Sequence, residues 1–173
     1  VKVSADTKLT NNWSSGFTAN YITTSIDKAV TSGNGLLRTV YAAPPSYDLA
    51  GIPSNVDGNP YTQNSFRGSF DNAYWAMENN KFTEDTNRFF GNVYASYQTD
   101  FGTTNHKLNA KYMVGVDAYT THYVDSYGYG SNTGGGRGQI ENYGWTNATY
   151  NSLLTINYDW HINEDWGLNA VVG

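Results

Sequence analysis

Strict alternation of apolar and polar residues is the feature of this sequence that most limits the folds open to it. Three long stretches show it, at Asn87–Thr99, His106–Tyr123 and Tyr150–His161. A period of two residues indicates a β-strand with unlike faces, because successive side chains point to opposite sides. The stretches exceed the about 5–6 residues of most globular strands and reach the roughly 9–11 residues of a tilted membrane-spanning strand. The sequence therefore predicts an all-β fold of long antiparallel strands.

The two faces of these stretches differ in polarity. Nearly every position on one face is apolar or aromatic and none is charged, as at Tyr97, Val114 and Ile156. Aromatic residues gather near both ends of this face, where the rings of a membrane protein lie at the level of the lipid headgroups. We expect the apolar face to meet lipid and the polar face to line a lumen. The candidate lumen-lining residues are Arg88, Asn92, Lys107, Lys111, Asp117 and Asp159.

Short and long connections alternate along the chain. The six expected strands cover about 1-10, 13-30, 87-99, 106-125, 143-161 and 166-173. The longest connection, 31-86, is expected to be a loop that contains a short helix at Gly35–Ala43, ended by Pro44. A loop of this length is unusual in a compact domain but typical of the extracellular side of an outer-membrane barrel. We therefore predict that residues 1-173 are a segment of a large antiparallel transmembrane β-barrel.

Composition and spacing exclude several other classes of protein. The chain has no Cys and a net charge of -5, so disulfide scaffolds, Cys-based zinc sites and a basic nucleic-acid surface are not expected. No apolar run approaches the ~18 residues of a transmembrane helix. His106, His122 and His161 are scattered, without the spacing of a metal motif. We expect no catalytic residue, no metal and no cofactor.

Two motifs resemble those of a transporter family. Phe70-Asp-Asn-Ala-Tyr-Trp75 and Asn87-Arg-Phe-Phe-Gly-Asn92 are similar, in order and spacing, to motifs of SusC/RagA-type TonB-dependent transporters of Bacteroidetes, with Ala73 where the family has Pro. The segments Asn34–Asp48 and Asn151–Trp166 also resemble parts of that family. The resemblance implies that Asp71, Asn72, Tyr74 and Trp75 lie in a loop that contacts the substrate or a lipoprotein.

The resemblance also implies a function. A SusC-like protein lies in the Gram-negative outer membrane and imports glycans or peptides with a SusD-like surface lipoprotein, driven by the TonB complex. On this resemblance we expect about six strands of a larger barrel here, with the plug domain and the TonB box outside these residues.

Two alternatives remain open from the sequence. A soluble carbohydrate-binding β-sandwich would explain the Tyr and Trp residues of the expected loops, such as Tyr129 and Trp145. A fragment of a β-rich glycoside hydrolase would need Asp117 and Asp159 to converge.

Overall fold

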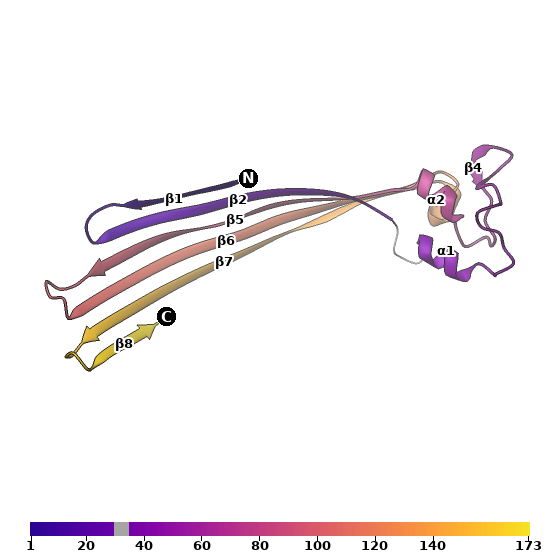
Figure 1. Ribbon diagram of the computed structural model, residues 1–173. Helices are drawn as coiled ribbons and strands as arrows, with labels where there is room; N and C mark the ends of the chain where they lie inside the picture. Colours follow the sequence, from indigo (N-terminus) through magenta and orange to yellow (C-terminus); the bar gives the residue numbers. More distant parts are fainter. Residues whose placement is uncertain (30–34) are drawn as a thin grey trace. The chain divides into compact units, whose positions relative to one another are not determined.

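Six strands form one mostly antiparallel sheet in the computed structural model, which describes residues 1–29 and 35–173. Figure 1 shows them side by side in the order β1-β2-β5-β6-β7-β8. Their bounds are β1 Lys2–Lys8, β2 Trp13–Lys28, β5 Lys81–Thr99, β6 His106–Tyr127, β7 Gln139–His161 and β8 Gly167–Val172. The all-β prediction is confirmed. The sheet is open, with β1 and β8 as its two edges.

The register of the edge strands is regular. β1 pairs with β2 from Lys2↔Asn20 to Lys8↔Ser14. β8 pairs with β7 from Ile156↔Val172 to His161↔Gly167. Both edge strands are short, so each covers only part of the long strand beside it.

The central strands differ in length from those expected. β5 begins at Lys81 rather than Asn87, β6 continues to Tyr127, and β7 begins at Gln139. Polarity alternates weakly in these added portions, but a strand extends wherever a neighbour pairs with its backbone. The strand expected over 13-30 is β2, which ends at Lys28. Residue 30 lies outside the described residues.

Local side-chain chemistry forms the three short turns. In the β1–β2 turn, the Thr10 hydroxyl oxygen accepts from the backbone nitrogens of Asn12 and Trp13, at 3.2 and 3.0 Å. In the β5–β6 turn, Phe101 and Gly102 have positive φ, at 55° and 75°. In the β7–β8 turn, the Asn163 side-chain oxygen accepts from the backbone nitrogens of Asp165 and Trp166, which is an Asx turn.

The chain divides into two compact units, to which all four long strands contribute. Unit 1 consists of Val1–Thr23, Asn87–Thr120 and Thr146–Gly173. It is a sheet with no apolar side chain buried; only Gly16 and Gly115 are buried within it. The apolar side chains of unit 1 therefore have no protein core to pack into.

Unit 2, Thr24–Thr86 and Thr121–Trp145, holds the core of the described residues. Phe70, Ala73, Trp75 and Phe82 are its buried apolar side chains. The helix expected at Gly35–Ala43 is confirmed as α1, Leu36–Ala42.

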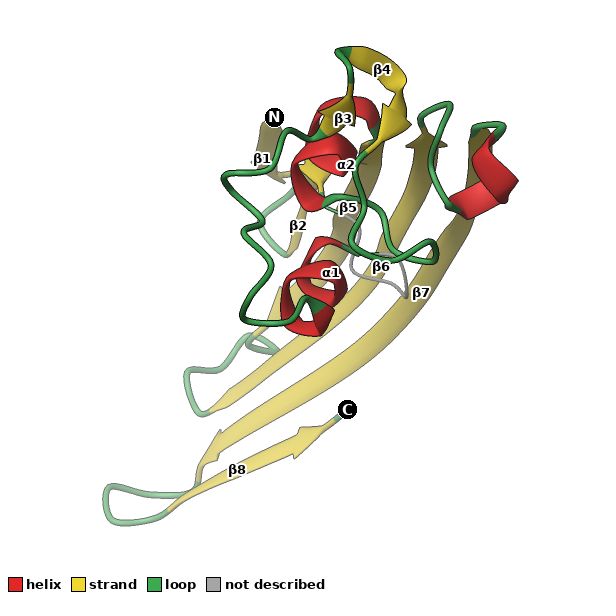
Figure 2. Cartoon of the chain, turned by 90° about the vertical axis from the view of Figure 1, so that its right-hand side faces the viewer, coloured by secondary structure: helices red, strands yellow, loops and turns green. Residues whose placement is uncertain are grey.

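The rest of the segment expected as a loop is more ordered than predicted. It contains the hairpin β3 Asn55–Val56 and β4 Asn59–Gln63, the helix α2 Ala73–Asn79, and the start of β5 (Figure 2). Asp57 and Gly58 both have positive φ, which suits a tight hairpin turn. Asn72 caps α2 by accepting from the backbone nitrogens of Tyr74 and Trp75. No helix in the described part of the chain has the length and apolar character needed to cross a membrane.

Gly91 of β5 lies where a larger residue has no room. A Cβ there would come within 2.3 Å of the Thr18 carbonyl oxygen of β2, a backbone atom that cannot rotate away. We expect Gly91→Ala to destabilise the sheet by about 1–3 kcal/mol, the usual cost of overpacking. The denaturant midpoint of the protein should fall accordingly. Gly68→Ala is the matched control, because nothing lies within 4 Å of its Cβ position; equal losses in the two variants would contradict the expectation.

Candidate functional site

Side-chain contacts in unit 1 stay within the two predicted faces. On the polar face, the Arg88 guanidinium of β5 forms a two-bond ion pair with the Asp117 carboxylate of β6, with Nε to Oδ1 at 2.8 Å. Two parallel hydrogen bonds orient both groups in a way that a single bond would not. The structure thus joins two of the six candidate lining residues across neighbouring strands.

A second polar group on this face links three strands. The Tyr94 hydroxyl of β5 donates to Asp6 of β1 at 2.6 Å, and Lys111 Nζ of β6 lies 4.3 Å from the centroid of the Tyr94 ring. Lys111, predicted as a lining residue, therefore forms a cation–π contact.

The remaining candidate lining residues lie apart from these groups. Lys107 borders an open cavity of about 470 Å³ that Lys8 and Gln98 also line. Asn92 is exposed on β5.

Asp159 accepts hydrogen bonds from the side-chain amides of Asn157 and Asn169. Asp117 and Asp159, the pair that a hydrolase would need, are thus engaged by different partners on different strands.

Aromatic groups occupy the apolar face near the short turns. The rings of Trp13 and Tyr97 lie 5.0 Å apart, and the His106 ring stacks on Trp160 at 5.6 Å. The Nδ1 atom of His106 and the Tyr158 hydroxyl share a hydrogen bond of 2.7 Å.

The Asp71 side chain is the centre of a buried hydrogen-bond network in unit 2. Its Oδ2 accepts from the Ser131 hydroxyl at 2.6 Å, and its Oδ1 accepts from the Asn132 backbone nitrogen and the Gln63 side-chain amide at 2.7 and 2.8 Å. The Asp71 carbonyl accepts from the Thr39 hydroxyl of α1. The Asp71 carboxylate thereby connects β4 with residues 131 and 132, while the Asp71 backbone carbonyl binds α1.

Most of the other predicted contact residues of the motif are buried and hydrogen-bonded within unit 2. Asn72 caps α2, and its side-chain amide donates to the Asn64 carbonyl at 2.9 Å. Trp75 has no exposed surface, and its indole nitrogen donates to the Pro60 carbonyl at 2.7 Å. Of the four predicted contact residues, only Tyr74, 46% exposed, presents surface that a partner can reach. Buried Asp71, Asn72 and Trp75 support this loop in the conformation described.

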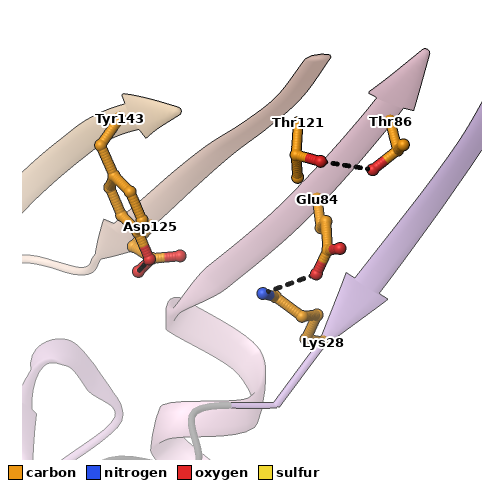
Figure 3. Close-up of polar contacts among 6 residues, drawn as sticks. All are labelled: Lys28, Glu84, Thr86, Thr121, Asp125 and Tyr143. Carbon is orange, nitrogen blue, oxygen red and sulfur yellow. Dashed lines mark hydrogen bonds and ion pairs between the residues drawn. The ribbon is translucent and has the colours of Figure 1, made fainter. Parts of the chain in front are cut away.

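A group of charged and aromatic side chains crosses one face of the unit 2 strands. We call it the aromatic–carboxylate cluster; it comprises Lys28, Glu84, Tyr123, Asp125, Glu141, Tyr143 and Trp145. Figure 3 shows the Lys28–Glu84 ion pair, 3.0 Å long, and Tyr143 beside Asp125. The Tyr143 hydroxyl donates to Asp125 at 3.1 Å. Above the ion pair in Figure 3, the hydroxyls of Thr86 and Thr121 are 3.1 Å apart.

The cluster as a whole is not evident from the sequence. Its members fall on odd positions of β6 and β7 and even positions of β2 and β5, in phase with the polar face of unit 1. The signal in the sequence is the same alternation of faces, continued before residue 87 in β5 and after residue 123 in β6. Of the seven residues, only Glu84 and Glu141 lie outside the expected strands.

Comparison with protein-family models, with curated proteins and with solved structures found no match for the chain. Within residues 1–29 and 35–173, no three His, Asp or Glu side chains gather in a way that would hold a metal ion.

Proposed function

We propose that this chain is part of the wall of an outer-membrane β-barrel that imports glycans or peptides, of the SusC/RagA TonB-dependent type. In this proposal the apolar face of unit 1 contacts lipid and the polar face lines the lumen. A SusD-like lipoprotein delivers the substrate, and the TonB complex supplies energy through parts of the protein outside these residues.

The uncovered apolar face of unit 1 is the observation that carries the proposal. Phe17, Val93, Val114 and Leu154 are all exposed on strands with two faces, and no element of unit 1 covers them. A continuous apolar surface of this extent is unfavourable in water, whereas lipid chains would satisfy it. The strand backbone also needs every hydrogen bond satisfied in lipid, which pairing in a sheet provides.

The length of the apolar face fits a bilayer. On β5 it runs from Phe89 to Tyr97, nine residues, and on β7 from Tyr150 to Trp160, eleven residues. A tilted strand needs about 9–11 residues to cross the hydrocarbon layer. In the unit 2 portions of β5, β6 and β7, the corresponding positions are mostly polar, such as Asp85, His122 and Asn142. This change supports a membrane boundary near the ends of unit 1.

The alternation of short turns with a long structured connection supports an orientation of the strands across the outer membrane. The three short turns would face the periplasm and unit 2 would extend outside the cell. Tyr74, exposed beside the buried Asp71 network, would then be available to a lipoprotein partner.

The soluble β-sandwich has less support. A sandwich packs two sheets face to face over a common core. The described residues form one six-stranded and one two-stranded sheet, and the buried apolar side chains belong to unit 2.

Cysteine labelling tests the proposal, since these residues contain no native Cys. Val93→Cys on the apolar face and Asn92→Cys on the polar face differ by one position in β5. In outer membranes of cells that produce the full protein, a lipid-soluble maleimide should label Val93→Cys. A water-soluble maleimide should label Asn92→Cys and leave Val93→Cys unmodified. Equal labelling of both by the water-soluble reagent, or recovery of the protein without detergent, would refute the proposal.

A further inference from the structure

Three aromatic rings of the aromatic–carboxylate cluster hold one another in place. The Tyr123 and Tyr143 rings are nearly parallel, with centroids 5.0 Å apart and planes 9° apart. The Trp145 ring lies 5.1 Å from Tyr123. Tyr143 and Trp145 nevertheless remain 44% and 52% exposed, so they present ring surface outward.

One end of the cluster already holds a cation of the chain itself. Lys28 Nζ lies 4.2 Å from the centroid of the Tyr123 ring and 3.0 Å from Glu84 Oε2. A ring face together with a carboxylate is a favourable environment for an ammonium or guanidinium group. The cluster is thus chemically suited to basic side chains.

The other end repeats this combination without a basic residue. Asp125 is hydrogen-bonded to Tyr143, and Glu141 lies two positions before Tyr143 on the same face of β7; among the described residues neither carboxylate has a Lys or Arg partner within 4.0 Å. Their resident partners are neutral: the Tyr143 hydroxyl on Asp125 and the Gln139 amide on Glu141 at 2.5 Å. Desolvation and the hydrogen bond to Asp125 raise the pKa of Tyr143, and the charges of Asp125 and Glu141 act in the same direction.

We propose that Asp125, Glu141, Tyr143 and Trp145, which follow one another along one face, bind a peptide through its lysine or arginine side chains. The inference rests on the proposed function, in which unit 2 lies outside the cell, and it narrows the imported substrates to peptides with basic residues. Charge complementarity favours this occupant: the four residues supply two negative charges and two ring faces. A neutral saccharide would use the rings but would leave both carboxylates without an opposite charge.

Binding of a fluorescent tetra-arginine peptide to the detergent-purified full protein tests the inference by anisotropy at low and high salt. We expect Asp125→Asn with Glu141→Gln to weaken binding about tenfold and Trp145→Leu to weaken it about 2–5-fold, given the size of exposed ion-pair and cation–π contributions. Added salt should weaken binding to the unaltered protein and should have little effect on the double variant.

Asp27→Asn with Asp85→Asn is the matched control. This variant also removes two negative charges, but from the opposite face of the unit 2 strands. Its affinity for the peptide should stay within about twofold of that of the unaltered protein. If it weakens binding as much as the double variant does, the effect is general electrostatics and the inference fails. It fails equally if the peptide does not bind the unaltered protein, or if neutral maltoheptaose displaces the peptide and binds with a dependence on Trp145 alone.

The labelling of Val93→Cys and Asn92→Cys separates the two proposals. Membrane insertion without peptide binding refutes only the basic-peptide inference. Peptide binding by a protein whose two cysteine variants are labelled alike would refute only the transporter proposal.

Discussion

On the proposed function, in which the apolar face meets lipid, replacing Val114 by Lys is expected to destabilise the protein by about 2–4 kcal/mol, the cost of a Lys on a lipid face near the bilayer midplane. Val114 lies on the apolar face of β6 and is 39% exposed. On the surface of a water-soluble sheet, a change at so exposed a position would matter little, within roughly 0.5 kcal/mol. Reversible unfolding by urea in phosphatidylcholine vesicles, carried out on the full protein, measures the difference.

Met113→Lys is the matched control for Val114→Lys. Met113 is the preceding residue of β6, so it has nearly the same depth in the strand but belongs to the polar face. We expect Met113→Lys to cost much less than Val114→Lys, because its ammonium group would reach water in the lumen. Equal costs in the two variants would show that lipid does not contact the apolar face of β6.

Replacing Trp75 by Ala is expected to disorder the loops of unit 2. A buried Trp that is truncated to Ala usually costs about 3–5 kcal/mol, and here the indole hydrogen bond to the Pro60 carbonyl is lost as well. Because Trp75 supports α2 next to the Asp71 network, the loss should increase amide exchange in α2, in β4 and around Ser131. Hydrogen exchange with mass spectrometry measures this locally.

Tyr74→Ala is the control for Trp75→Ala. Tyr74 is the adjacent residue in α2, is aromatic and is largely exposed. Its replacement should leave exchange in unit 2 almost unchanged, with an effect of roughly 0.5 kcal/mol or less. If Tyr74→Ala increases exchange as much as Trp75→Ala, the core of unit 2 is not organised around the buried indole. If Tyr74 instead contacts a lipoprotein, its replacement should weaken capture of that partner without changing amide exchange.

The hydrogen-bond partners of Asp71 could not be predicted from the sequence. The motif around Asp71 predicts residues that contact a partner, but three of these four residues are buried. The Asp71 carboxylate has hydrogen-bond partners, Gln63 and Ser131, that are 8 and 60 residues away along the chain. A buried carboxylate must be satisfied by hydrogen bonds, but which groups satisfy it depends on how distant segments meet.

The α1 helix and the short turns, by contrast, depend on neighbouring residues. Pro44 cannot continue a helix, which limits α1 to residues before it. Asn163 forms its turn with residues two and three positions further on. Interactions between residues so close along the chain can be predicted from the order of residues alone.

The two faces of the long strands follow from the order of residues, because side-chain direction in a strand repeats every two residues whatever the strand pairs with. The alternation at Asn87–Thr99 and Tyr150–His161 was therefore sufficient to assign Arg88 and Asp159 to one face and Tyr97 and Ile156 to the other. The extension of β5 to Lys81 and the meeting of Lys28, Glu84, Tyr123 and Tyr143 depended on the folded chain. Those contacts join residues from four strands, and strand pairing between distant segments is a property of the tertiary structure rather than of any local pattern.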